Sequence, residues 1–302
     1  MGKKVGIIGV GHVGSTTAYT LIQKQIADEL VLFDKNEKIV EAEINDLIQG
    51  QIGNESTVRI KGNDLSQLAS CDVFIFSAGK IELLAGGADR FEELSFTKKV
   101  VEEWAPKIKA SGFNGILLSV TNPCDVIVRY LQELTGLPKN KIFGTGTSLD
   151  TARMKQAVGE GFGVHPNSVK GYVLWEHGET QFIAWSTVRI AEQQVANGLS
   201  AEKIEYLEKE ASAAGSRIFL GKIYTCYGIA NQAAKITKAI LTDADVVIPV
   251  SAYSESEKLY IGQPALIGAS GIKKTFDLTL TEDEQLSWRR SVEKIKEMYA
   301  AI

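Results

Sequence analysis

The chain contains three histidines, and histidine suits proton transfer because its ordinary pKa lies near neutral pH. His12 lies within a glycine-rich segment, and His165 precedes a proline in a predicted loop. His177 lies in the turn Glu176-His177-Gly178-Glu179, between two predicted strands. His177 is therefore a candidate general acid, and a purely structural turn histidine is the alternative.

Asp150 and Arg153 lie three residues apart, a spacing that a helix places on one side. A carboxylate that hydrogen-bonds the second nitrogen of an imidazole fixes its tautomer and stabilises the imidazolium. Asp150 is a candidate for this role toward His177, or alternatively the N-cap of a helix that begins at Thr151. The N-cap interpretation does not explain Arg153, whose planar guanidinium suits bidentate binding of a carboxylate.

The segment from Gly9 to Gly14 is a GxGxxG that follows a predicted strand and begins a predicted helix. Glycines there permit a tight turn and close approach of the backbone to a pyrophosphate, which the helix N-terminus then binds. Asp34 ends the next predicted strand, twenty residues after Gly14, and its carboxylate suits the ribose hydroxyls of NAD. NAD is therefore the predicted cofactor, and a glycine turn beside a surface aspartate is the alternative.

The elements that must position these residues alternate in the first half of the chain. Apolar runs at 5–8, 30–33, 73–76 and 116–120, with a weaker one at 58–60, are typical of parallel strands covered on both faces. Helical patterns at 15–25, 37–48, 91–110 and 125–135 separate or follow them. This alternation predicts an α/β fold with a Rossmann doubly wound parallel sheet.

The second half has a different pattern, which predicts a C-terminal α+β substrate domain. We expect paired strands at 169–176 and 181–190, a helical stretch at 201–240 interrupted near Ile223, strands at 246–252 and 263–272, and a helix at 282–300. The change of pattern near Gly144 divides the chain into a predicted NAD-binding domain, 1–143, and a substrate and catalytic domain, 144–302. Because no flexible linker joins them, we expect the two parts to pack closely.

Composition narrows the class of protein. A net charge of −4 without a basic run argues against nucleic-acid binding. Three cysteines outside any CxxC spacing argue against disulfides or structural zinc, so we expect no metal and a reducing compartment. The short apolar run after Lys4 is too soon interrupted for a signal peptide or a membrane span, which predicts a cytoplasmic protein.

Together with Val120-Thr121-Asn122-Pro123, these motifs make the chain resemble the L-lactate/L-malate dehydrogenase family, in the same order from about residue 4 to the C-terminus. The resemblance implies reversible hydride transfer between NAD and a small 2-oxo or 2-hydroxy acid by a homo-oligomer, a dimer or a tetramer. It implies that His177 is the catalytic acid–base group with Asp150 as its partner, and that Arg153 binds the substrate carboxylate. Arg90 matches a loop arginine that polarises the carbonyl, although alone it could be a surface charge, and Asn122 matches a residue that contacts substrate and nicotinamide.

The resemblance also assigns the walls of the site. Further substrate-pocket positions are Leu83, Leu84, Ala85, Thr225 and Gly215, the last providing space for a bulky substrate. Cofactor positions are Gly9, Gly11, His12, Val13, Gly14, Asp34, Ala78, Gly79, Val120, Asn122 and Ile229.

Substrate preference depends on the loop at residues 80–89. Lactate enzymes carry glutamine and malate enzymes arginine at the loop position that faces the substrate side chain, whereas this chain has Ile81-Glu82-Leu83-Leu84-Ala85. The loop is about two residues longer than in typical lactate enzymes, so its register stays open. An apolar loop favours a branched aliphatic substrate, because each extra buried methylene contributes about 0.8 kcal/mol. We therefore predict conversion of 4-methyl-2-oxopentanoate to L-2-hydroxyisocaproate, with L-lactate dehydrogenase as the alternative and malate disfavoured.

A protein of another class, a non-catalytic NAD-binding sensor, would keep the same nucleotide motif, because a fold alone does not establish a function. Such a sensor has no need for His177, Asp150, Arg153 and Arg90 together, and all four are present. The enzyme interpretation is therefore favoured.

Overall fold

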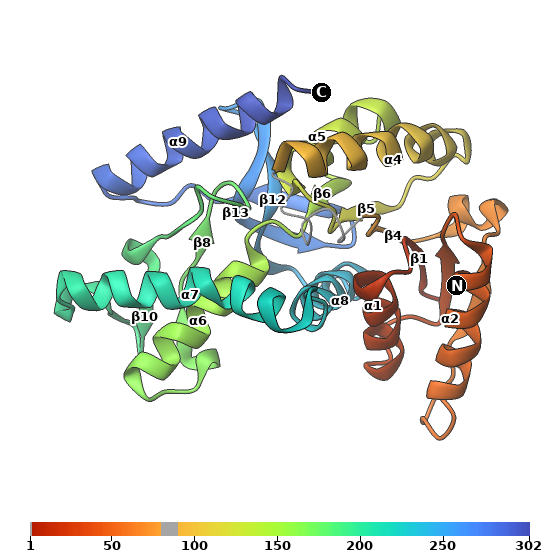
Figure 1. Ribbon diagram of the computed structural model, residues 1–302, viewed down its shortest axis with the longest axis horizontal. Helices are drawn as coiled ribbons and strands as arrows, with labels where there is room; N and C mark the ends of the chain where they lie inside the picture. The colour runs from red at the N-terminus through yellow and green to blue at the C-terminus, as the bar shows by residue number, and fades with distance from the viewer. Residues whose placement is uncertain (1, 80–89) are drawn as a thin grey trace.

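The computed structural model describes residues 2–79 and 90–302, apart from the side chains of residues 90 and 91. Its centre is a nine-stranded sheet in the order β14-β13-β12-β6-β5-β4-β1-β2-β3 (Figure 1). The six strands from β6 to β3 are parallel, in the order expected of a Rossmann sheet. They are β1 (Lys4–Ile8), β2 (Glu29–Phe33), β3 (Arg59–Gly62), β4 (Val73–Phe76), β5 (Ile116–Ser119) and β6 (Ile142–Gly144). The α/β prediction is confirmed.

Helices cover both faces of this sheet, which explains the continuous apolar runs of its central strands. Phe74 and Phe76 of β4 pack in a core with α4 (Arg90–Ala110) and α5 (Cys124–Thr135). Val73 and Ile75, which point to the opposite face, pack with α1 (His12–Gln23), α2 (Glu37–Gly50) and α8 (Tyr227–Leu241). Successive residues of a strand alternate between faces, so both sides must be apolar.

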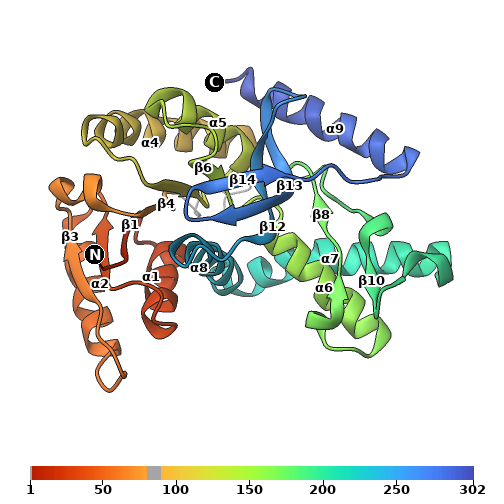
Figure 2. The same cartoon turned by 180° about the vertical axis from the view of Figure 1, so that it is seen from behind.

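Three antiparallel strands from the end of the chain continue the same sheet (Figure 2). β12 (Val246–Ser254) pairs with β13 (Leu259–Gly268) and joins β6 where Ser251 lies opposite Gly144. The prediction of one strand at 263–272 is wrong, because the chain reverses between β13 and β14 (Gly271–Thr275). Gly271 makes this turn possible with a φ of +87°, a conformation that side chains rarely adopt.

The predicted strands at 169–176 and 181–190 are in fact four short strands. β8 (Val173–Leu174) pairs with β9 (Phe182–Ile183), and β7 (Val169–Lys170) pairs with β10 (Arg189–Ile190), which also pairs with β11 (Gln193–Gln194). Gly171, at a φ of +119°, and a 3₁₀ turn interrupt the longer runs. The 3₁₀ segments are η1 (Leu65–Ser70), η2 (Pro166–Ser168), η3 (Trp185–Thr187) and η4 (Ala196–Gly198).

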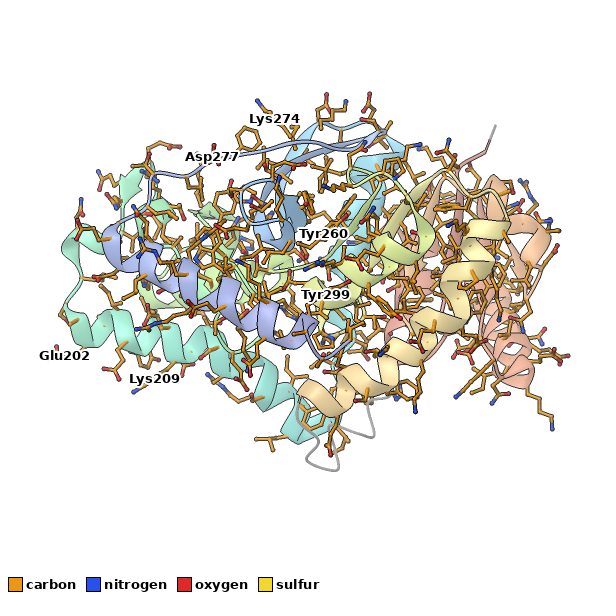
Figure 3. The ribbon with its side chains drawn as sticks, turned by 90° about the horizontal axis from the view of Figure 1, so that it is seen from above. Glu202, Lys209, Tyr260, Lys274, Asp277 and Tyr299 are labelled. Atoms are coloured by element: carbon orange, nitrogen blue, oxygen red, sulfur yellow. The ribbon has the colours of Figure 1, made fainter. Side chains whose placement is uncertain are left out.

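Four helices complete this half: α6 (Ser148–Phe162), α7 (Ala201–Lys222), α8 and α9 (Glu282–Tyr299). The break predicted near Ile223 is confirmed, because Ile223 ends α7 in a left-handed conformation with a φ of +68°. Tyr299, which is labelled in Figure 3, ends α9. The Arg129 guanidinium of α5 lies 3.7 Å from the centre of the Tyr299 ring. Within residues 2–79 and 90–302, no helix combines the length and apolar character that crossing a bilayer requires.

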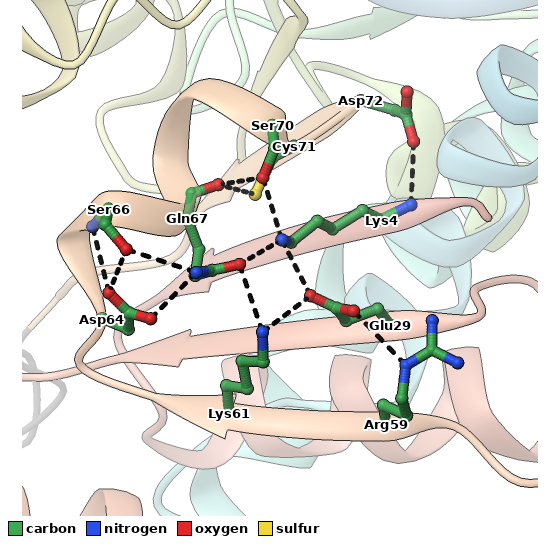
Figure 4. A network of polar contacts seen from close by, with 10 residues as sticks. All are labelled: Lys4, Glu29, Arg59, Lys61, Asp64, Ser66, Gln67, Ser70, Cys71 and Asp72. Atoms are coloured by element: carbon green, nitrogen blue, oxygen red, sulfur yellow. Dashed lines mark hydrogen bonds and ion pairs between the residues drawn. The ribbon is translucent and has the colours of Figure 1, made fainter. Parts of the chain in front are cut away.

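A polar network joins the first three strands at their amino ends (Figure 4). Glu29 Oε1 lies 2.7 Å from Lys4 Nζ and 3.6 Å from Lys61 Nζ, and Oε2 lies 3.4 Å from Arg59 Nε. The hydrogen bond from Lys4 lowers the pKa of the Glu29 carboxyl. The network therefore links these three strands at their amino ends, whereas the candidate site lies at the carboxyl ends of the parallel strands.

Candidate active site

The predicted cofactor residues of the first half of the chain lie at or after the carboxyl ends of the parallel strands. Gly9 follows β1, Asp34 follows β2, Ala78 follows β4 and Asn122 follows β5. A cleft of about 1160 Å³ opens at this edge and extends to α6, α7 and the turn at His177. Of the predicted residues, it is lined by Gly11, His12, Val13, Ala78, Gly79, Val120, Asn122, Asp150, Arg153, His177, Gly215, Thr225 and Ile229. A cleft of this size exceeds the range of about 300–1,000 Å³ typical of drug-sized ligands.

The glycine loop fits a dinucleotide. A Cβ at Gly14 would lie 1.8 Å from the Gly9 carbonyl oxygen, and one at Gly9, whose φ is +81°, would lie 2.7 Å from the Ser77 oxygen. These two glycines thus permit close backbone packing rather than line the cleft, whereas a Cβ at Gly11 would meet nothing within 4 Å. Helix α1 begins at His12 without a side-chain cap, so its first N–H groups suit a phosphate.

Asp34, the residue after β2, hydrogen-bonds to this loop. Its Oδ2 accepts a hydrogen bond from the Val10 N–H at 3.1 Å, and its Oδ1 accepts one from the Asn36 N–H at 3.0 Å. The carboxylate is therefore held beside the glycine loop, where the ribose adjoining a bound pyrophosphate would be recognised.

His177, Asp150 and Arg153 form one hydrogen-bonded group. His177 Nδ1 lies 2.7 Å from Asp150 Oδ2, and Arg153 Nη1 donates to Asp150 Oδ1 at 2.9 Å. Burial opposes ionisation of Asp150, which is 3% exposed, but the charges of His177 and Arg153 outweigh it and lower the pKa of the carboxyl. An ionised carboxylate can only accept hydrogen bonds, so His177 Nδ1 must carry a proton to bond with Asp150. Nε2 of His177 is therefore the nitrogen that gains or loses a proton. Because α6 begins at Ser148 with Thr147 as N-cap, the N-cap interpretation of Asp150 is wrong.

Asp125 is a buried carboxylate that the sequence analysis did not single out. Its Oδ2 accepts the His177 backbone N–H at 2.9 Å, and its Oδ1 accepts the Ser251 hydroxyl at 2.5 Å. Burial raises the pKa of Asp125 to about 6. Asp125 follows Asn122 by three residues at the start of α5, so a charged residue inside an apolar helical pattern was the available signal. Through these two hydrogen bonds, Asp125 of α5 links the backbone of the His177 turn to Ser251 of β12.

Gly215 of α7 lies against Arg153. A Cβ at Gly215 would lie 3.0 Å from Arg153 Nη2 and 3.1 Å from Cζ. The missing side chain therefore makes room for the guanidinium, and the expectation that Gly215 also provides space for a bulky substrate stays a prediction.

Tyr224 is a second residue that the sequence analysis missed. Its ring stacks on the His12 ring, with centroids 3.7 Å apart and planes 5° apart. Both residues line the cleft, and they come from opposite halves of the chain. No sequence signal marks such a distant pair. The expectations for Leu83, Leu84 and Ala85 lie outside the described residues, as does the side chain of Arg90, which is the first residue of α4.

Comparison with known proteins agrees with this geometry. Residues 3–144 match the family model for the lactate/malate dehydrogenase NAD-binding domain, and residues 147–301 match the model for its α/β C-terminal domain. The chain is 36% identical to the L-lactate dehydrogenase of Halalkalibacterium halodurans, over 100% of this chain and 98% of that protein. It is also 36% identical to the L-lactate dehydrogenase of Staphylococcus saprophyticus, over 98% of this chain and 95% of that protein.

Solved structures agree. The ligand-bound minor L-lactate dehydrogenase of Enterococcus mundtii superposes with a TM-score of 0.94 at 30% identity, covering 99% of this chain and 98% of that one. The lactate dehydrogenase of Cryptosporidium parvum, solved with lactic acid and NAD, has a TM-score of 0.93 at 26% identity, covering 99% and 98%. With both domain models matched along nearly its whole length, the chain belongs to the lactate/malate dehydrogenase family.

Proposed function

We propose that the protein is an NAD-dependent L-2-hydroxy-acid dehydrogenase that interconverts pyruvate and L-lactate. The observation that carries this proposal is the group formed by His177, Asp150 and Arg153, which lines the same cleft as the glycine loop. A nucleotide-binding protein without chemistry has no need for a buried carboxylate that orients a histidine beside a guanidinium.

The residues of the chain would divide the reaction among them. The glycine loop and Asp34 would hold the dinucleotide, which when bound supplies a hydride in its reduced form and accepts one in its oxidised form. Arg153 binds the carboxylate of the 2-oxo acid through its guanidinium, and the imidazolium of His177 donates a proton from Nε2 to the carbonyl oxygen. Asp150 stabilises the imidazolium before the transfer, and in the reverse direction neutral His177 takes the proton from the hydroxyl.

The identity of the substrate is the finer part of the proposal. The relatives named above are L-lactate dehydrogenases, so they support pyruvate better than the branched substrate that we predicted. The branched acid stays a second candidate because of the apolar sequence at Leu83-Leu84-Ala85. Leucine and alanine side chains cannot form an ion pair with the second carboxylate of oxaloacetate, so that charge would be buried without a partner.

Oxidation of NADH with pyruvate, oxaloacetate and 4-methyl-2-oxopentanoate, measured side by side, tests this proposal. We expect pyruvate to have the highest kcat/KM. A higher value for 4-methyl-2-oxopentanoate would restore the branched-substrate prediction. A higher value for oxaloacetate would contradict both, and the absence of turnover with all three acids would favour a sensor.

Asp34→Ala is expected to relax the preference for NADH over NADPH by about tenfold or more. The substitution removes the acceptor for the ribose hydroxyls and the charge that repels a 2′-phosphate. The ratio of kcat/KM for the two cofactors measures the effect, with Asp28→Ala, at the other end of β2, as the control. An unchanged ratio would remove Asp34 from cofactor selection.

Two features of organisation belong to the proposal. The division at 143/144 is supported by the limits of the two matched family models. Association into a homo-oligomer is supported by large exposed apolar side chains outside the cleft, among them Ile52 after α2 and Tyr227 at the start of α8, which are 80% and 72% exposed. Light scattering is expected to give a dimer or a tetramer, and a monomer at micromolar concentration would contradict this part.

A further inference from the structure

Gln181 is a third donor to the carboxylate of Asp150. When the amide is oriented with its nitrogen toward the carboxylate, that nitrogen lies 3.0 Å from Asp150 Oδ2 and 3.3 Å from Oδ1. The nitrogen must face the carboxylate, because the opposite orientation would place the amide oxygen against two acceptors. Gln181 also lines the cleft that contains His177.

The local structure holds Gln181 in place. It directly precedes β9, which pairs with β8 on the other side of the His177 turn. Within the turn, the N–H and hydroxyl of Thr180 donate to Glu176 Oε2 at 2.8 and 2.9 Å. Ser291 of α9 in turn donates to the Thr180 carbonyl oxygen at 3.0 Å. Gln181 therefore lies between a paired strand and a threonine that is hydrogen-bonded to Glu176 and to Ser291 of α9.

We propose that Gln181 is a positioning residue that lowers the proton affinity of His177 by sharing the negative charge of Asp150. The proposal rests on the proposed function only for the role of His177. Asp150 already accepts a hydrogen bond from His177 at Oδ2 and one from Arg153 at Oδ1. An additional N–H donor stabilises the anion and so reduces the charge that the carboxylate offers to the imidazolium.

Several ionisable groups lie near His177, and of these Arg153 also donates to Asp150, at Oδ1. Asp125 of α5 binds the backbone of His177 rather than its ring. Glu176 accepts from Thr180, and Glu179 is exposed in the turn. Glu93 of α4 lines the same cleft. Within the described part of the chain, Gln181 is the neutral side chain that meets Asp150 directly, so replacing it with methionine removes a donor to Asp150 without changing any charge.

Two substitutions predict shifts of opposite sign. Gln181→Met keeps the length of the side chain and removes the donor, so the His177 pKa is expected to rise by roughly half a unit. Gln181→Lys places a cation beside Asp150, so the pKa is expected to fall by about one unit. Gln193→Met, at an exposed glutamine of β11, is the matched control and is expected to leave it unchanged.

NMR titration of the imidazole resonances, in the full chain with NADH bound, measures these shifts without depending on turnover. The chain has only three histidines, and His177→Asn assigns the resonance. Shifts upward in Gln181→Met and downward in Gln181→Lys support the proposal. A His177 pKa that both variants leave within 0.2 of the unsubstituted protein, a margin of roughly 0.3 kcal/mol, overturns it, as does a shift of the same sign in both.

The pH profile of kcat/KM adds a second readout. Reduction of the oxo acid requires protonated His177, so the rate falls as pH rises through its pKa, and that limb is expected to move with the NMR value. A merely structural role would lower the rate without moving the limb. If the unsubstituted protein does not turn over any oxo acid, the proposed function fails, while the titration still decides the role of Gln181.

Discussion

His177→Ala is expected to lower kcat for pyruvate reduction by at least about a thousandfold. The substitution removes the proton donor, whose Nδ1 lies 2.7 Å from Asp150 Oδ2. Among the described residues that line the cleft, the other histidine is His12, and its ring stacks on Tyr224. NADH binding, measured by the change in its fluorescence, is expected to persist, because the glycine loop and Asp34 lie at the ends of other elements.

His165→Ala provides the matched control, since His165 lies outside the cleft in the turn that precedes η2. It is expected to retain kcat. Near-normal turnover of His177→Ala would remove His177 from the mechanism, and loss of NADH binding together with turnover would show that the substitution acts through the fold instead.

Arg153→Lys is expected to lower kcat/KM for the oxo acid by about a hundredfold, chiefly through a higher KM. A lysine keeps the charge but cannot form two parallel hydrogen bonds to a carboxylate. The lysine also cannot reproduce the hydrogen bond from Arg153 Nη1 to Asp150 Oδ1, so the salt bridge to Asp150 is weakened at the same time. Steady-state kinetics with pyruvate separate the change in KM from any change in kcat.

Gly215→Ala perturbs the same guanidinium without altering its chemistry. The new Cβ would lie 3.0 Å from Arg153 Nη2, so the side chain must shift by a few tenths of an ångström. We expect a smaller rise in KM, roughly tenfold. Gly221→Ala, near the end of the same helix, is the control, because a Cβ there meets nothing within 4 Å. An unchanged KM in both Arg153→Lys and Gly215→Ala would contradict a carboxylate-binding role for Arg153.

The sequence by itself determined the layered architecture and the nucleotide loop. Runs such as 73–76 are apolar at every position because both faces of the sheet are covered, so burial leaves a signal that needs no knowledge of distant residues. The GxGxxG and Asp34 are equally local, since a turn, a strand end and a helix start lie within one βαβ unit. The break at Ile223 was visible as a change of pattern between two helices.

Only the tertiary structure decided which residues meet. The segment 263–272 was predicted as one strand, but a turn divides it into the end of β13 and the start of β14, which pair antiparallel. The apolar pattern of the run gave no sign of this turn. Asp125 and His177 are 52 residues apart, and Asp150 and His177 are 27 apart. Residue types and spacing indicate which chemistry is available, whereas distances such as that from Gln181 to Asp150 arise when separate elements pack against one another. The physical reason is that periodicity reports local conformation and burial, and contacts between distant side chains exist only after the core has formed.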